Sequence, residues 1–139
     1  MTEPRLVHLS LGAFPMTTSR LQRTASVVLA LGFVVLGLMH LNAAVFSVWM
    51  SGGPPNPYPV GWERRALGQF SFSVAAFMLS VGSYKLVISL PSWRRVPTVL
   101  ILIGVALLSA PYAGRLVLHG QCLDRGGQWS NLTLQCSTK

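Results

Sequence analysis

Acidic residues are almost missing from this chain: Asp and Glu together number 3 in 139 residues, against 11 Lys and Arg. No Asp or Glu lies in the long apolar stretches, where a proton relay or a cation site would need a carboxylate. Glu63 and Asp124 lie in polar flanks, and no Ser-His-Asp arrangement can be assembled around them. The sequence therefore disfavours an enzyme and predicts no catalytic residue and no cofactor.

Charged residues of either sign are also scarce, at 10%, whereas 51% of the residues are hydrophobic. That is too apolar for an ordinary soluble domain, so the bilayer is the expected solvent. The net charge of +8 forms no run or groove-sized cluster, which argues against nucleic-acid binding. The basic residues instead flank apolar stretches, as membrane-flanking charges do. They include Arg20 and Arg23, Arg64 and Arg65, and Arg94 and Arg95.

Three apolar stretches are long enough to cross a bilayer, which takes about 20 helical residues. They are residues 24–50, 66–90 and 96–118. The charges at Lys85 and Arg115 lie near the ends of their stretches, where long side chains can reach the headgroups. We therefore predict an all-α membrane protein in which residues 24–118 form one domain of three transmembrane helices.

Residues 1–23 show no clear periodicity and are expected to form a flexible cytoplasmic leader. Arg20 and Arg23 ahead of an apolar stretch would also suit a cleavable signal peptide. That stretch runs well beyond the about 7 to 15 residues of a signal-peptide core, and no A-x-A cleavage site ends it. The first stretch is therefore predicted to remain as an anchor, with translation starting at Met1 or Met16.

The two connections between the stretches differ in character. Residues 51–65 contain four prolines, which lack backbone donors and favour extended conformations. We expect a stiff surface loop there, held at the headgroups by Trp49, Tyr58 and Trp62, that serves as a plain connection or as a docking segment for a partner. Residues 91–95 are expected to form a short polar turn.

The only 2 cysteines, Cys122 and Cys136, lie in the tail formed by residues 119–139. A glycine pair between them allows a tight turn, and the alternation of residues 128–135 predicts a short strand that returns Cys136 to Cys122. Such a hairpin has no core, and a disulfide closing a loop of about 15 residues stabilises it by about 3 kcal/mol. We therefore predict a short β-hairpin-like tail stapled by a disulfide.

Two other uses of the cysteines stay open. A metal site could draw on His119, Cys122, Asp124 and Cys136, but a single H-x-x-C spacing is a weak signal, and no metal is predicted. The thiols could also remain reduced and structural. A catalytic dithiol would favour C-x-x-C spacing, which this pair lacks.

Charge alone marks the orientation only weakly. With the amino terminus inside, six Lys and Arg lie on the inner side and five on the outer side. The cysteine pair adds a second argument, because disulfides persist in oxidising compartments. An odd number of spans places the tail opposite the amino terminus. We therefore predict a cytoplasmic amino terminus and a periplasmic or extracellular carboxyl terminus.

The tail carries the pattern C-x3-G-G-x-W-x6-C, formed by Cys122, Gly126, Gly127, Trp129 and Cys136. This pattern resembles a signature of small, uncharacterised bacterial envelope and inner-membrane proteins, and it covers 15 of the 139 residues. The resemblance implies an exported disulfide hairpin and a location in the bacterial inner (plasma) membrane. It implies no activity.

Three polar side chains inside the predicted spans could carry chemistry: His40, Asn42 and Gln69. A haem held by two histidines would need a partner for His40 at similar depth, whereas His119 lies at or beyond the outer surface. We expect His40 and Asn42 to bond across helices or to backbone carbonyls instead. A redox or metal-handling enzyme built on His40, His119 and the cysteines is the second alternative function.

Ala106, Ala110 and Gly114 recur every four residues in the third span and form a small-residue stripe, which lets another helix approach closely. The stripe can serve packing among the three helices, or contact with a partner protein or another copy of the chain. Pro111 lies within it and predicts a kink. Beyond the lipid bilayer itself, we therefore predict a role as an accessory or interaction subunit of a membrane complex. An oligomeric transport or pore-forming protein is the first alternative.

Overall fold

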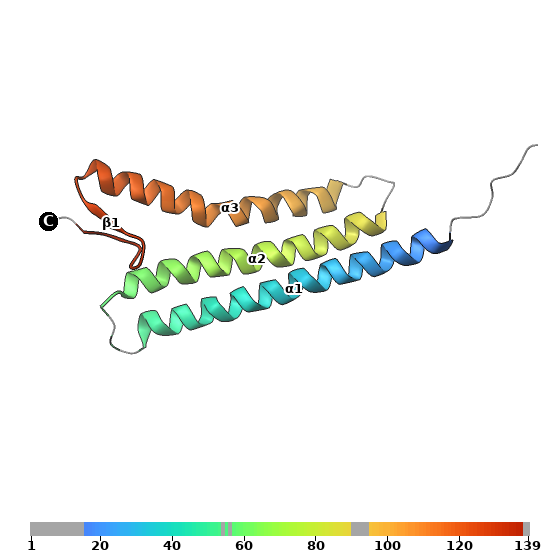
Figure 1. The fold of residues 1–139 in the computed structure, drawn as a ribbon, viewed down its shortest axis with the longest axis horizontal. Helices are drawn as coiled ribbons and strands as arrows, with labels where there is room; N and C mark the ends of the chain where they lie inside the picture. Colours follow the sequence, from blue (N-terminus) through green and yellow to red (C-terminus); the bar gives the residue numbers. More distant parts are fainter. Residues whose placement is uncertain (1–15, 54, 56, 90–94, 138–139) are drawn as a thin grey trace, which may run out of the picture.

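The chain folds into three long helices followed by a short pair of antiparallel strands (Figure 1). The computed structural model describes residues 16–53, 55, 57–89 and 95–137. Each of the three helices is long and apolar enough to cross a membrane, so the chain is a multi-pass membrane protein and the predicted fold class is confirmed. The elements are α1 (Met16–Gly52), α2 (Pro59–Ser89), α3 (Arg95–Asp124), β1 (Gln128–Ser130) and β2 (Gln135–Ser137).

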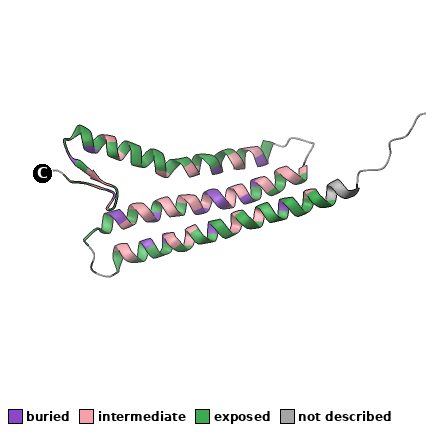
Figure 2. Ribbon diagram, viewed as in Figure 1, coloured by how far each residue is buried: buried purple, intermediate pink, exposed green. Residues whose placement is uncertain are grey.

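The helices lie side by side in one layer, with α2 between α1 and α3 (Figure 1). Figure 2 shows that buried residues gather on α2, whereas α1 and α3 are exposed over most of their surface. The buried side chains of α2 are small; they include Ser73, Ala75, Ala76 and Ser80. Small side chains let neighbouring backbones approach, which is how helices commonly associate in lipid.

The contact between α1 and α2 depends on a glycine and on side chains that bond to the opposite backbone. A Cβ added at Gly37 would lie 2.9 Å from the ring of Phe77, so the ring fills the space that a side chain would take. The Ser80 hydroxyl donates to the carbonyl oxygen of Ala30 at 2.9 Å. The Gln22 side-chain amide donates to the carbonyl oxygen of Val87. Both bonds cross between the helices and fix the position of one along the other.

α3 packs closely against α2 only over its first half. A Cβ added at Gly104 would lie 2.9 Å from the side chain of Leu79, and the Ser71 hydroxyl donates to the carbonyl oxygen of Leu107 at 2.9 Å. Beyond this level α3 bends and diverges from α2 (Figure 1). Pro111 lies inside the helix and accounts for the bend, because proline removes a backbone hydrogen bond and clashes with the preceding turn.

The helices run past the spans predicted from the sequence. α1 already begins at Met16, so residues 16–23 are helical and do not form a flexible leader, while residues 1–15 lie outside the described part of the chain. Hydropathy marks only the lipid-facing part of a helix, and a helix continues into the headgroup region wherever its residues allow. The turn expected over 91–95 lies outside the described residues except for its last position.

The loop between α1 and α2 is shorter than the predicted stiff segment of residues 51–65. α2 begins at Pro59, because proline suits the first helical turn, where its missing N–H would have no helical partner anyway. The segment after Pro59, which contains Arg64 and Arg65, is therefore helical. Both arginines come to lie on a rigid element, in the first turns of α2.

The tail differs from the predicted hairpin in the position of its turn. Gly126 does not connect two strands; it ends α3 in the left-handed conformation, with φ of 67°. Its N–H donates to the carbonyl oxygen of Leu123 at 2.8 Å, and the Gly127 N–H donates to that of Cys122 at 3.0 Å, a common helix-ending arrangement. The turn between β1 and β2 falls instead on residues 131–134, inside the segment predicted to be one strand.

Candidate functional site

The disulfide joins the end of α3 to β2. Cys122 and Cys136 are bonded, with their Cα atoms 5.6 Å apart, so the predicted disulfide is confirmed. Cys122 is buried in the last turns of the helix, and Trp129 pairs with Cys136 across the two strands. A Cβ added at Gly127 would lie 2.5 Å from the Cys136 sulfur, which explains the need for glycine next to the bond. The disulfide thus fastens the hairpin to a helix. We call residues 125–137 the clasp.

The clasp has a second attachment, on α2. Arg64 donates to the carbonyl oxygen of Leu134, and Arg65 donates to that of Leu132. The Arg65 guanidinium also lies 5.0 Å from the centre of the Trp62 ring. Between the two bonds the clasp backbone at Thr133 rests on Gly61, where there is no room for any side chain. The clasp therefore bridges the start of α2 and the end of α3, which diverge from each other.

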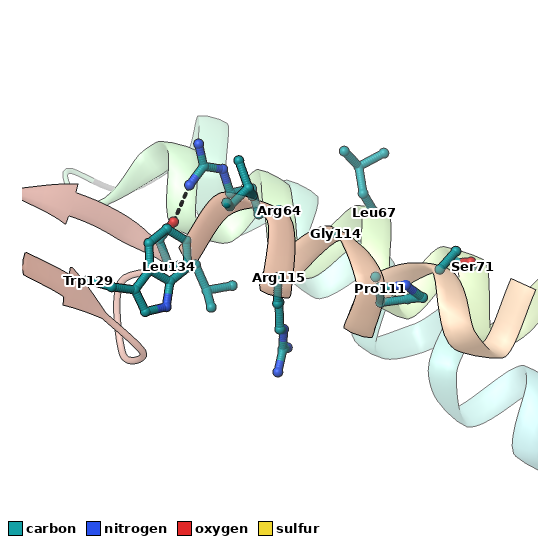
Figure 3. A pocket seen from close by; sticks show the side chains of 11 residues that line it. Arg64, Leu67, Ser71, Pro111, Gly114, Arg115, Trp129 and Leu134 are labelled. Carbon is teal, nitrogen blue, oxygen red and sulfur yellow. Dashed lines mark hydrogen bonds between the residues drawn. The ribbon is translucent and has the colours of Figure 1, made fainter. Parts of the chain in front are cut away.

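A cavity of about 270 Å³ lies below this bridge, between α2 and the bent half of α3. Figure 3 shows Trp129 and Leu134 at its clasp end and Pro111 and Ser71 at its deep end, where the two helices meet. Its walls are mainly apolar, since they include Leu67, Leu118 and Leu134. The Ser71 hydroxyl at the deep end is already bonded to the α3 backbone. The cavity exists because the kink in α3 opens a gap that the clasp spans.

Two arginines lie at the clasp end of the cavity. Arg64 and Arg115 line it, and Figure 3 shows Arg64 turned toward Leu134 while Arg115 extends away from it. Within the part of the chain that the structure describes, Arg115 makes no hydrogen bond and no ion pair. Its exposed guanidinium is therefore available to a ligand.

Two further cavities adjoin the first one around Trp129. One, of about 320 Å³, is lined by Arg115, His119 and Asn131 among others. The other, of about 130 Å³, is lined by Arg64 and Arg125. The rings of His119 and Trp129 lie 6.2 Å apart. No described Asp or Glu lines any of the three cavities, so the group as a whole is electropositive.

The tail does not form the alternative metal site. Both cysteines are in the disulfide, so the alternative metal site at the tail loses its two thiolates. Among the described residues no three His, Cys, Asp or Glu side chains lie together so as to hold a metal ion. What the site offers is an apolar interior next to unpaired positive charge.

His40 lies away from the clasp, in the contact between α1 and α2. Its Nδ1 is 2.6 Å from the Oε1 of Gln69, and its ring lies 5.3 Å from that of Phe72. This is an interhelical bond of the kind predicted for His40. Asn42, by contrast, is exposed and makes no interhelical hydrogen bond to any described residue, so the bond predicted for it is not formed.

A double-mutant cycle measures the bond between His40 and Gln69. His40→Leu and Gln69→Leu should each lower the free energy of unfolding, and their coupling should be about 0.6 kcal/mol, the typical value for interhelical bonds in membranes. The measurement is unfolding of the full chain in mixed micelles, followed by circular dichroism. Asn42→Leu is the matched control and should show no coupling with Gln69→Leu. A His40–Gln69 coupling of zero would contradict the structural assignment.

The small-residue stripe is not used for packing among the helices. Ala106, Ala110 and Gly114 are all exposed, and a Cβ added at Gly114 would meet nothing within 4 Å. The close approach of α3 to α2 is made by Gly104 instead, while Ala110 and Gly114 line the cavity that the bend in α3 opens next to α2. Of the two uses considered for the stripe, the structure favours contact with something outside the chain.

Sequence reasoning missed Arg64, Arg65 and Trp129 as parts of one site. A signal was present: Pro59 can start a helix, and a helix from Pro59 places Gly61, Arg64 and Arg65 on one face by their spacing of three and four. Nothing in the sequence indicated that the clasp would rest on that face.

Comparison of the chain with protein-family models, with curated proteins and with solved structures finds no match. Its function is therefore argued from its own residues.

Proposed function

We propose that this chain is a non-catalytic accessory subunit of a membrane complex, and that α3 contacts a transmembrane helix of its partner through the small-residue stripe. The observation that carries the proposal is the exposure of Ala106, Ala110 and Gly114. Small residues on a helix face that contacts only lipid give no packing advantage. They do let another helix approach closely, and that helix then gains van der Waals contact. A surface of this kind in an otherwise large-residue apolar helix suits a protein partner.

The proposed location is a bacterial inner membrane, with the amino terminus in the cytoplasm and the clasp outside. Three spans put the two ends of the chain on opposite sides. The disulfide between Cys122 and Cys136 supports an oxidising compartment for the clasp. The slight majority of Lys and Arg on the inner side agrees with this orientation.

The single-layer arrangement bears on the alternative of a pore. α1 and α3 lie on opposite sides of α2 and enclose no path between them (Figure 1). A pore would therefore require several copies of the chain, arranged around an axis. The stripe on α3 would then be the contact between copies, so the same surface serves both hypotheses.

Ala106→Leu tests the stripe, because Ala106 does not line the cavity under the clasp. Leucine at this position holds a neighbouring backbone away, so we expect the partner to be lost from the complex. The measurement is native mass spectrometry of the protein extracted from its own membranes in mild detergent. Additional mass from another polypeptide supports an accessory subunit, and a multiple of the chain's own mass supports self-assembly. Whichever complex is found should become about 5- to 30-fold weaker in the variant, as for the loss of a close helix contact of about 1 to 2 kcal/mol.

Val105→Phe is the matched control. Val105 is exposed at the same depth but lies about 100° around the helix from Ala106, so added bulk there does not meet a helix on the stripe. The complex should survive this change. An assembly that is untouched by Ala106→Leu, or a chain that is monomeric without any substitution, would refute the stripe hypothesis.

A further inference from the structure

We propose that the cavity between α2, α3 and the clasp binds an anionic phospholipid, one whose headgroup phosphate is not balanced by a positive group of its own. The phosphate lies at Arg115 and part of an acyl chain lies in the cavity. The cavity shares Ala110 and Gly114 with the stripe, whereas Ala106 does not line it, so the partner contact is tested at Ala106 and the lipid site at Arg115.

The size of the cavity fits a hydrocarbon chain and does not fit a helix. An apolar cavity of about 150 Å³ accepts benzene, so the 270 Å³ found here has room for a segment on the order of ten carbon atoms. One turn of a helix with a diameter of about 10 Å occupies roughly 400 Å³, which is more than the whole cavity. Leu67, Pro111, Leu118 and Leu134 supply an apolar lining that matches a chain.

The charge at the outer end fits a phosphate. Arg115 is exposed and unpaired among the described residues, and arginine binds phosphate oxygens through two parallel N–H groups. Arg64 uses one N–H for Leu134 and has four left, so it can add to the same anion. His119 and Asn131 lie in the adjoining cavity as further polar groups.

The depth of these groups in the membrane fits a lipid better than a soluble anion. Arg115 lies near the end of the third apolar span, and Tyr112 and Trp129 lie beside it, as aromatic residues do at the level of the headgroups. The cavity extends from this level toward the middle of the bilayer, down to Ser71. A lipid has its phosphate and its chain in this same order. A free phosphate ion would leave the apolar part empty.

The test reads the fluorescence of Trp129, which lies at the site. The full chain is reconstituted in vesicles with Trp129 as its sole tryptophan, and brominated phosphatidylglycerol or brominated phosphatidylcholine is added as the quencher. The replacements that remove the other tryptophans are Trp49→Phe, Trp62→Phe and Trp93→Phe. We expect brominated phosphatidylglycerol to associate at least about fivefold more strongly than the choline lipid. This is the factor that corresponds to about 1 kcal/mol of attraction between one arginine and an anionic lipid.

Substitutions at Arg115 identify the group responsible. Arg115→Gln should reduce the preference to about one, and Arg115→Lys should retain most of it, because lysine keeps the charge. Arg95→Gln is the matched control: Arg95 is also exposed on α3 but lies at the opposite end, so this change should leave the preference intact. Equal quenching by the two lipids, or a preference that survives Arg115→Gln, would overturn the proposal. Arg115 is exposed and unbonded among the described residues, so its replacement leaves the fold intact, which circular dichroism verifies.

Discussion

Replacing both cysteines, Cys122→Ser together with Cys136→Ser, should raise the frequency with which the clasp opens by about 100-fold. In the chain-entropy model, the loop of about 15 residues closed by this disulfide gains about 3 kcal/mol, and each 1.4 kcal/mol corresponds to a factor of ten. The hairpin has no core to replace that contribution, since its strands are three residues each. The two arginine bonds to α2, the contact at Gly61 and the ring contact between His119 and Trp129 would remain.

Hydrogen exchange of residues 128–137 measures this opening, in the full chain held in detergent micelles. Chemical reduction of the unmodified protein should reproduce the effect of the double substitution. Exchange in the first half of α1 should not change, because that half lies at the opposite end of the helices from the clasp (Figure 1), and it supplies the internal control. If the clasp amides kept their protection without the disulfide, the arginine bonds would hold the clasp alone, and its redox state would have no structural role.

Gly61→Ala should detach the clasp from α2 while leaving the disulfide in place. Alanine normally stabilises a helix interior by about 0.5 to 1 kcal/mol relative to glycine. At Gly61 we expect alanine to destabilise the structure instead, because the added Cβ would lie well under 3.0 Å from the carbonyl oxygen of Thr133. This oxygen belongs to the backbone, which cannot move aside as a flexible side chain can. The clasp must lift, and the bonds from Arg64 and Arg65 break with it.

The expected loss in stability of the attachment between the clasp and α2 follows from those two bonds. Hydrogen bonds to charged groups contribute about 1.5 to 3 kcal/mol each when buried, and these lie partly exposed, so we expect a loss of about 2 kcal/mol in total. That corresponds to about 30-fold faster exchange of the amides in the turn at residues 131–134. Arg64→Leu should give part of the same effect.

Gly120→Ala is the control for Gly61→Ala. It makes the same chemical change at the outer end of a neighbouring helix, and a Cβ there would meet nothing within 4 Å. It should leave exchange in the clasp unchanged and stabilise α3 slightly. Equal effects of the two alanines would mean that Gly61 does not carry the clasp.

The disulfide attaches the clasp to α3 and Gly61 seats it on α2, so changes at either place also affect the lipid site. Opening the clasp at the disulfide or at Gly61 removes Trp129 and Leu134 from the end of the cavity. Both changes should therefore weaken the preference for phosphatidylglycerol, although neither alters Arg115. The clasp thus supplies the shape of the site, and the arginine supplies its charge.

The sequence by itself determined the membrane class, the three spans and the disulfide. Hydropathy is a property of consecutive residues, so runs of apolar residues report directly that the chain lies in lipid. The disulfide between Cys122 and Cys136 was predictable because a short tail without a core needs a covalent link. The interhelical bond of His40 also followed, since a polar group in lipid must find a partner.

Only the tertiary structure decided which surfaces are used within the chain and which remain free. The clasp rests on α2 through residues 70 positions apart, Arg64 and Leu134, and no local pattern encodes such a contact. The glycine pair looked like a hairpin turn, and only the continuation of α3 to Asp124 made Gly126 its end. The stripe at Ala110 could have faced either way, because its spacing fixes which residues share a side of the helix, while packing against α2 fixes where that side points.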